Sequence, residues 1–296
     1  MQTQIEILNG NVNSHIIGIV MKEAVRRAIS AIRHQRFIFE SSAKLGLGGN
    51  LDDMVTTADK EAQQIYVKIL RECFPTCGIV AEEEKLQIAC QIDGMDIFFT
   101  VDPLDGTKAF VRKQSHGIGT MISLVADGKV VAAFIGDVMS QEIYGFRPNS
   151  KKTHRISEYD HTQEICIDPD FKLSDQYVLL RTDPSKHSHA IRRLIVPIEN
   201  GGIFKGLEVT GGSIGSSMAR LWKAEVGAAV LTPGHNTPWD LCPVLGISQH
   251  LGFVFMKPQA SSWVVFEPKA CREIQVLDHD VLIVHNSRLS ELSLSD

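Results

Sequence analysis

The sequence predicts a mixed α/β protein in which layers of sheet and helix are stacked on one another. Apolar residues recur at helical spacing near the start of the chain, and short apolar runs in the middle end in acidic residues. Beyond residue 175, segments typical of strands alternate with segments typical of helices. Of the 296 residues, 44% are hydrophobic, which is enough to bury the substantial core that a layered fold requires.

Two helices are predicted in the first quarter of the chain. Residues 14–36 place apolar side chains three and four positions apart, and ADKEAQQIYVKILREC (58–73) does the same. Asp59 and Glu61 fall in the first turn of the second helix, where the helix dipole favours acids. The stretch KLGLGGNLDD (44–53) between the helices is rich in glycine, so it predicts a mobile loop.

The middle of the chain is typical of strands. A hairpin is indicated around Asp127-Gly128, because this dipeptide favours a tight turn between two apolar runs. The runs that predict strands are CGIVAEEE (77–84), DIFFTVDP (96–103), the hairpin GIGTMISLVADGKVVAAFIGDV (117–138) and EIYGF (142–146).

Residues 150–175 are polar and weakly patterned, and we expect a boundary between two lobes there. The prediction is an N-terminal α+β lobe over 1–150 and a C-terminal α/β lobe over 151–296. In the second lobe, helices are predicted for SHAIRRLI (188–195), TGGSIGSSMARLWKAEVG (210–227) and PWDLCPVLGISQHLG (238–252). Strands are predicted for YVLLR (177–181), IFKGLEV (203–209), AAVLT (228–232), FVFM (253–256), SWVVF (262–266) and VLIVHN (281–286).

Composition excludes several classes of protein. The formal charge is −5, with acids and bases spread along the chain rather than gathered into the basic stripe of a nucleic-acid binder. No apolar run approaches the roughly 18 residues of a membrane span, and MQTQIEILNGNVNS lacks the pattern of a signal peptide. We therefore expect a cytoplasmic protein with reduced cysteines, whose partner is a small molecule rather than a nucleic acid or a membrane.

Carboxylates gather at the ends of two predicted strands. Glu82 and Glu83 follow GIVA, and Asp102 and Asp105 follow IFFTV with Pro103 between them. Like charges this close repel and raise one another's pKa, a cost that a divalent cation removes. Mg²⁺ prefers such oxygen ligands, and Pro103 directs both aspartates toward one point. The alternative is an ordinary capped turn, which also uses Asp, Pro and Gly.

Gly106-Thr107 extends the same hypothesis. If a helix starts here, its unpaired N–H groups face the cation and are suited to hold a phosphate. The Thr107 hydroxyl is then able to polarise an attacking water, provided that a carboxylate takes its proton.

Four motifs resemble the inositol monophosphatase superfamily of Mg²⁺-dependent, lithium-sensitive phosphatases. They are VTTAD (55–59), VAEEE (80–84), VDPLDGTKAF (101–110) and PWD (238–240), in the family's order and at about its spacing. The resemblance implies a layered αβαβα sandwich of the inositol monophosphatase and sugar phosphatase type. One departure is Ala81, where many members have glycine. Homodimerisation is common in that family.

The resemblance also implies roles for individual residues. Two or three Mg²⁺ ions would be held by Glu82, Asp102, the Leu104 carbonyl, Asp105 and Asp240. Asp59 and Thr107 match the pair that activates the attacking water, with Glu82 completing the catalytic set. Gly106 and Thr107 match the phosphate cradle, and residues 44–53 match the family's mobile active-site loop.

Substrate preference depends on less regular segments. Lys108 and the GSS-led helix with Gly215 and Ser216 resemble the 3′(2′),5′-bisphosphate nucleotidase branch, and no acid occurs between Val230 and Trp239, where inositol monophosphatases carry a glutamate. Lys108 also fits a solvated helix residue, and Ser216 also fits a helix cap. The alternatives are an inositol or sugar monophosphatase, a histidinol-phosphate phosphatase, or a non-catalytic binding or regulatory relative.

Overall fold

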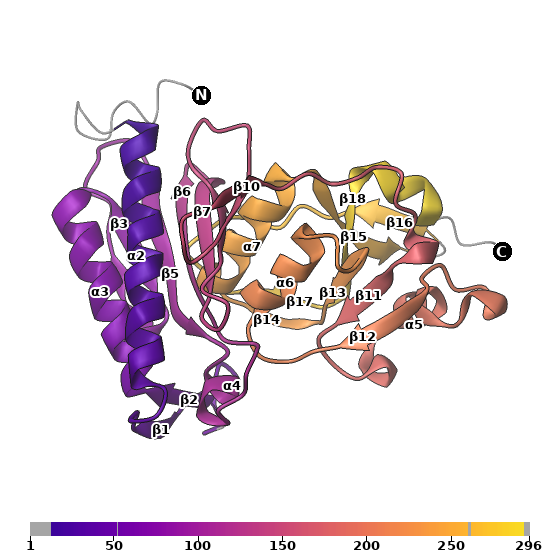
Figure 1. Ribbon diagram of the computed structural model, residues 1–296, viewed down its shortest axis with the longest axis horizontal. Helices are drawn as coiled ribbons and strands as arrows, with labels where there is room; N and C mark the ends of the chain where they lie inside the picture. Colours follow the sequence, from indigo (N-terminus) through magenta and orange to yellow (C-terminus); the bar gives the residue numbers. More distant parts are fainter. Residues whose placement is uncertain (1–12, 52, 260–261, 293–296) are drawn as a thin grey trace.

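The computed structural model describes residues 13–51, 53–259 and 262–292. Helix and sheet alternate in five layers (Figure 1). Helices α2 (Ser14–Gln35) and α3 (Thr57–Cys73) cover the outer face of an eight-stranded sheet, and α6 (Ile214–Trp222) and α7 (Pro238–His250) lie between this sheet and a six-stranded one. Helix α5 (His189–Ile195) packs on the far face of the second sheet.

The eight-stranded sheet has the order β10-β9-β8-β7-β6-β5-β3-β4. Only β3 and β5 run parallel among its neighbouring strands; the other pairs are antiparallel. Its strands are β3 (Gly78–Ala81), β4 (Gln87–Ile88), β5 (Ile97–Asp105), β6 (Gly119–Ala126), β7 (Lys129–Asp137), β8 (Ile143–Phe146), β9 (His154–Ile156) and β10 (Thr162–Glu164).

The six-stranded sheet has the order β12-β11-β13-β18-β15-β16, with β11 parallel to both of its neighbours. Its strands are β11 (Tyr177–Leu180), β12 (Gly206–Val209), β13 (Ala228–Leu231), β15 (Phe253–Gln259), β16 (Ser262–Val265) and β18 (Val281–His285). Two further pairs are formed by β1 (Ser41–Lys44) with β2 (Asp53–Thr56), and by β14 (Gly234–Asn236) with β17 (Gln275–Leu277).

Side-chain alternation explains the layering. Successive side chains of a strand point to opposite faces, so Phe99 of β5 packs under α2 and α3 while its neighbour Phe98 packs toward α6 and α7. A third apolar cluster joins the outer face of the six-stranded sheet to α5 and the 3₁₀ helix η5 (Asn286–Leu292). Both faces of each sheet are therefore covered, which requires apolar residues along nearly the whole of the central strands.

The predicted fold class is confirmed. Helices α2, α3, α5 and α7 begin and end close to the expected residues. Helix α6 is shorter than the predicted 210–227, and beyond its end Ala224 has a φ of 59°, which is not helical. The hairpin turns at Asp127-Gly128, where both residues have positive φ (48° and 76°) as a two-residue turn of this kind requires. Strand β12 covers only the second half of IFKGLEV. Strands β9 and β10 add to the first sheet beyond residue 150, and the division into lobes at that residue stays a prediction. Within the described part of the chain, no helix has both the length and the apolar character to cross a membrane.

Candidate active site

An irregularity in β5 aims two aspartates at one point. Asp102 pairs with Met121 of β6, but Asp105 pairs with Gly119, so β5 carries one residue more than its partner across this interval. In a regular strand, residues three apart point to opposite faces. The extra residue of such a bulge cancels that alternation, and it brings both carboxylates to the same side.

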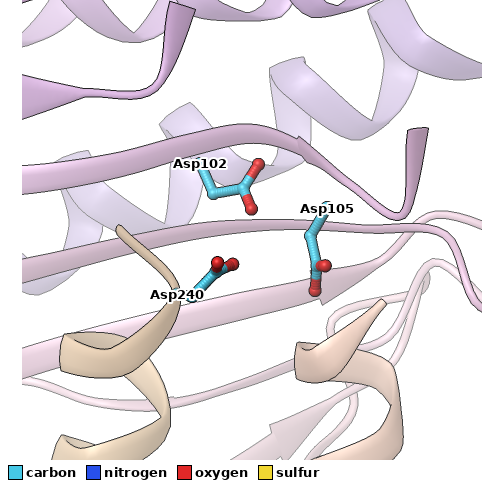
Figure 2. Close-up of side chains that lie close together, drawn as sticks. All are labelled: Asp102, Asp105 and Asp240. Atoms are coloured by element: carbon cyan, nitrogen blue, oxygen red, sulfur yellow. The ribbon is translucent and has the colours of Figure 1, made fainter. Parts of the chain in front are cut away.

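A third carboxylate comes from the other side of the cleft. Asp240 lies in the first turn of α7, where the Thr237 hydroxyl caps the helix and donates to Asp240 Oδ2 at 2.7 Å. Carboxylate oxygens of Asp102, Asp105 and Asp240 all lie within 4.8 Å of one another (Figure 2). The structure thus joins residues that are far apart in sequence into one cluster of hard oxygen donors.

The cluster is electrostatically unfavourable without a cation. Burial, followed by repulsion from Asp240, raises the pKa of Asp105 to about 6. Burial and the neighbouring carboxylates Glu82, Asp105 and Asp240 raise the pKa of Asp102 well above its usual range. Asp102 Oδ1 is buried without a hydrogen-bond partner among the described residues. A buried carboxylate oxygen that has no hydrogen-bond donor and is surrounded by other carboxylates fits a hard divalent cation such as Mg²⁺.

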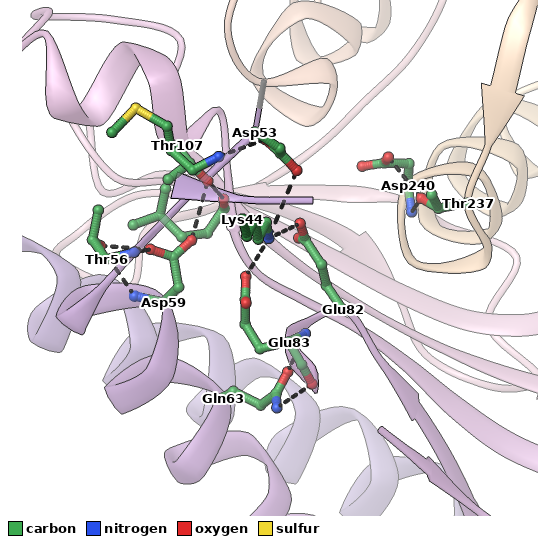
Figure 3. A network of polar contacts seen from close by, with 12 residues as sticks. Lys44, Asp53, Thr56, Asp59, Gln63, Glu82, Glu83, Thr107, Thr237 and Asp240 are labelled. Carbon is green, nitrogen blue, oxygen red and sulfur yellow. Dashed lines mark hydrogen bonds and ion pairs between the residues drawn. The ribbon is translucent and has the colours of Figure 1, made fainter. Parts of the chain in front are cut away.

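Glu82 lies beside this cluster and is turned toward a lysine. Lys44 Nζ, from the end of β1, lies 2.8 Å from an oxygen of Glu82 and 2.8 Å from one of Glu83 (Figure 3). Burial raises the pKa of Glu82 to about 8, although Lys44 opposes the shift. Lysine is therefore the cation that partly neutralises this side of the site.

The structure brings Asp59 and Thr107 together, the two residues that the family resemblance pairs. Thr107 Oγ1 lies 3.1 Å from Asp59 Oδ1 and 3.1 Å from the Leu104 carbonyl oxygen, so its single hydroxyl hydrogen has two acceptors within reach. Asp59 Oδ2 accepts from the Thr56 N–H at 2.7 Å, which completes a capping box at the start of α3. Burial raises the pKa of Asp59. The carboxylate is thus fixed by a helix start with one oxygen left for the hydroxyl.

The amino end of α6 holds Asp105 in place. The Ser213 hydroxyl donates to Asp105 Oδ2 at 2.5 Å, the Gly215 N–H donates to the same oxygen at 2.8 Å, and the Ile214 N–H donates to Oδ1 at 3.1 Å. Ser213 is also the N-cap of α6, because its hydroxyl accepts from the Ser216 N–H at 2.9 Å. The predicted substrate contact Gly215 is therefore engaged with Asp105.

A polar pocket of about 210 Å³ opens beside Asp105 and Asp240. Its wall comprises Asp105, Arg181, Ile214, Leu231, Thr232, Pro233, Gly234, His235, Asn236 and Asp240. Apart from the two aspartates of the cluster, this lining contains no acid. The pocket is suited to the organic part of a small ligand.

The remaining predicted residues have different surroundings. Gly106 begins the short helix α4 (Thr107–Val111) with a φ of 90°. Lys108 is exposed on that helix. The Ser216 hydroxyl donates to the Ile118 carbonyl oxygen at 3.4 Å.

Three residues of the site were missed by the sequence analysis. Ser213 precedes the GSS motif and had only the signature of a helix cap. Lys44 begins the glycine-rich segment, where a single lysine predicts nothing specific. Arg181 ends the apolar run YVLLR, and only the three-dimensional arrangement brings it to the carboxylates.

Comparison with known sequences gives one family. The sequence profile of the inositol monophosphatase family matches residues 14–294. A Nus factor SuhB of Vibrio cholerae is 34% identical over 126 residues, 41% of this chain and 44% of that protein. The inositol-1-monophosphatase of Bacillus subtilis is 27% identical over 128 residues, 42% and 45% respectively. These matches span less than half the length of either relative.

Solved structures share the fold over nearly the whole chain. An inositol monophosphatase (IMPase) of Thermotoga maritima superposes with a TM-score of 0.67 at 18% identity, covering 92% of this chain and 93% of that one. The extragenic suppressor protein SuhB of Bartonella henselae gives 0.68 at 17% identity, covering 94% and 96%. At this identity the likeness shows the fold.

Proposed function

Because this chain belongs to the inositol monophosphatase family, we propose that it is a phosphomonoesterase that depends on divalent metal ions. The observation that carries the proposal is the cluster of Asp102, Asp105 and Asp240, with its repelling charges and its unpartnered buried oxygen. A structure described as an IMPase/NADP phosphatase complexed with Mg²⁺ and phosphate has this fold, with a TM-score of 0.66, which supports Mg²⁺ as the ion.

The three aspartates would hold the metal, with the Leu104 carbonyl oxygen and Glu82 as further ligands. Bound divalent ions supply Lewis-acid stabilisation of the phosphoryl oxygens and of the leaving group. Glu82 would exchange its ion pair with Lys44 for the cation. We propose that the site holds two or three such ions.

Thr107 and Asp59 are assigned to the attacking water. When the Thr107 hydroxyl donates its hydrogen to Asp59 rather than to the Leu104 carbonyl oxygen, its lone pairs accept from a water, and the proton given up by that water passes through the hydroxyl to the carboxylate. The raised pKa of Asp59 makes this buried carboxylate a better proton acceptor than an exposed one. No covalent intermediate is required.

Gly106 and Thr107 are assigned to the phosphate. Their N–H groups precede the first backbone hydrogen bonds of α4, in which Ala109 and Phe110 donate to the Gly106 carbonyl. The N–H groups at the start of a helix have no partner within the helix, so they can donate hydrogen bonds to the anionic oxygens of a phosphate. The Lys108 side chain is exposed beside them, where it would contact a second anionic group of the substrate.

For the substrate we propose a 3′(2′),5′-bisphosphate nucleotide. Support comes from the pocket beside Asp105, which offers Arg181, His235 and Asn236 and contains no acid outside the cluster. This lining favours an anionic or polar leaving group. Inositol phosphates, sugar phosphates and histidinol phosphate are the alternatives. A homodimer and a cytoplasmic location are proposed on the family resemblance and on composition.

One experiment tests both levels of the proposal. Phosphate release is measured with Mg²⁺ on 3′-phosphoadenosine 5′-phosphate, inositol 1-phosphate, a sugar bisphosphate and histidinol phosphate, ranked by kcat/KM. The nucleotide is expected to rank first. Another ester in first place would overturn the substrate assignment alone. Failure to hydrolyse any of the four would favour a non-catalytic binding relative.

A further inference from the structure

Arg181 stands at the junction between the six-stranded sheet and the metal cluster. It follows the last residue of β11 and is partly buried in the wall of the pocket that Asp105 and Asp240 share. Its guanidinium donates three hydrogen bonds to the segment that begins α6. Nη1 contacts the Ser213 carbonyl oxygen and the Ser217 hydroxyl, both at 3.0 Å, and Nη2 contacts the Gly212 carbonyl oxygen at 2.7 Å.

The segment that Arg181 holds is the one that holds Asp105. Ser213 gives its carbonyl oxygen to Arg181 and its hydroxyl to Asp105. The next two N–H groups, from Ile214 and Gly215, also reach Asp105. The planar guanidinium therefore holds one side of the turn at Gly212 and Ser213, and the other side of that turn donates hydrogen bonds to the Asp105 carboxylate. A lysine ammonium also carries three donors, but it lacks the rigid planar fork that presents two nitrogens to these three acceptors.

The same segment is tied to the first sheet on its far side. The Ser213 N–H donates to the Gly117 carbonyl oxygen at 2.8 Å, and Gly106 packs directly on this contact. Arg181 is thus the only one of these attachments that comes from the six-stranded sheet.

We propose that Arg181 is a positioning residue that locks the amino end of α6 against Asp105 and so presets this carboxylate for a divalent cation. The proposal rests on the metal-dependent function proposed above. In this role Arg181 orients Asp105 and does not itself contact the metal. A hydrogen-bonded residue behind a ligand changes metal affinity by about 10- to 100-fold when it is lost.

The test measures Mg²⁺ binding by calorimetry on the full chain, with Arg181→Gln, Arg181→Lys and Arg220→Lys compared to wild type. Arg220 lies on the same helix and pairs with Glu208 and Glu225, so it is the matched control. We expect Arg181→Gln to weaken Mg²⁺ binding at least about 10-fold, Arg181→Lys to recover only part of this loss, and the control to bind as wild type.

Two further measurements separate positioning from general stability. Free guanidinium ion at millimolar concentration is expected to restore Mg²⁺ binding to Arg181→Ala, since it refills the vacated site. In a double-mutant cycle, Arg181→Gln and Ser213→Ala are expected to be far from additive, because both act through the same turn.

Wild-type Mg²⁺ affinity in a folded Arg181→Gln protein would overturn the proposal. If Arg181→Gln does not fold, Arg181→Lys decides, and equal Mg²⁺ affinity in that variant and wild type would overturn it as well. Absence of both Mg²⁺ binding and phosphatase activity in wild type would instead sink the proposed function.

Discussion

Lys44 Nζ lies 2.8 Å from Glu82 Oε1, so a side-chain cation occupies an oxygen of the glutamate that we propose as a further metal ligand. We predict that Lys44→Met strengthens Mg²⁺ binding about two- to fivefold, which corresponds to the loss of one partly exposed ion pair. Calorimetric titration at about pH 8 measures this. Lys68→Met, an exposed lysine of α3, is the control. Weaker binding in Lys44→Met would show that Lys44 supports the site instead of competing for it.

Asp105→Asn tests the metal cluster. The amide keeps the size of the side chain and an oxygen for the amides of α6, but it loses the charge that a cation requires. We expect kcat/KM to fall at least about 100-fold while the circular dichroism spectrum is unchanged. Wild-type activity of this variant at saturating Mg²⁺ would contradict the assignment.

Thr107→Val removes the hydroxyl that lies 3.1 Å from Asp59 Oδ1 and conserves the shape of the side chain. If Thr107 and Asp59 act together on the water, kcat should fall by about 10²- to 10⁴-fold with little change in KM. Thr107→Ser restores the hydroxyl and should recover much of the rate. An equal loss in Val and Ser variants would point to packing as the cause.

Removal of the metal should make the stability of the folded protein fall as the pH rises. In the metal-free protein, burial and mutual repulsion raise the pKa of Asp105 to about 6, and burial raises that of Glu82 to about 8. These carboxyls bind protons more tightly in the folded chain than in the unfolded one, where their pKa values are about 4. Their contribution to stability is therefore full below about pH 4 and is lost as the pH rises toward about 8.

Mg²⁺ binds the ionised carboxylates and should cancel this loss. We predict that saturating Mg²⁺ raises the Tm by roughly 5 °C or more at about pH 8 and by much less at about pH 5. Thermal melts with Mg²⁺ and with EDTA measure the difference. A Mg²⁺ effect of the same size at both values would contradict the titration of these groups.

Gly106→Ala tests the close approach between the sheet and the turn before α6. Gly106 has a φ of 90°, and an added Cβ would lie 2.3 Å from the Gly117 carbonyl oxygen and 2.7 Å from the Ser213 nitrogen. We expect a loss of about 1–3 kcal/mol in the free energy of unfolding, measured by urea denaturation. Gly48→Ala, where no described atom lies within 4 Å of an added Cβ, should be nearly neutral.

Periodicity and turn chemistry were sufficient to predict most helices and strands. The helical repeat of residues 14–36 and the Asp127-Gly128 turn report on local interactions, which a sequence displays directly. The extent of β12 could not be predicted, because Ile203 and Phe204 are as apolar as a strand requires and only pairing with β11 decides where the ladder begins.

The site, too, was predicted where the local sequence carries a motif and was missed where it does not. The family resemblance implied that Asp102, Asp105 and Asp240 belong together, and the structure brings carboxylate oxygens of all three within 4.8 Å of one another. It did not predict that Gly215 donates to Asp105, since a glycine amide has no side-chain signature. Lys44 and Arg181 were missed for a related reason, because each is a single basic residue in a segment without a motif. Their partners lie far away in the sequence: Glu82 and Glu83 for Lys44, and the turn before α6 for Arg181.

The pocket beside the metal cluster has a consequence for how this fold diversifies. Most of its rim, residues 231–236, comprises the end of β13, the strand β14 and the turn between them, and it supplies none of the cluster's carboxylates. Asp102 and Asp105 belong to β5 of the first sheet, and Thr107 begins α4. Residues of the rim can therefore be substituted without changing Asp102, Asp105 or Thr107. Under the proposed function, substitutions in the rim change which phosphate ester the pocket accepts while the carboxylate cluster stays the same, so relatives with this fold can differ in substrate.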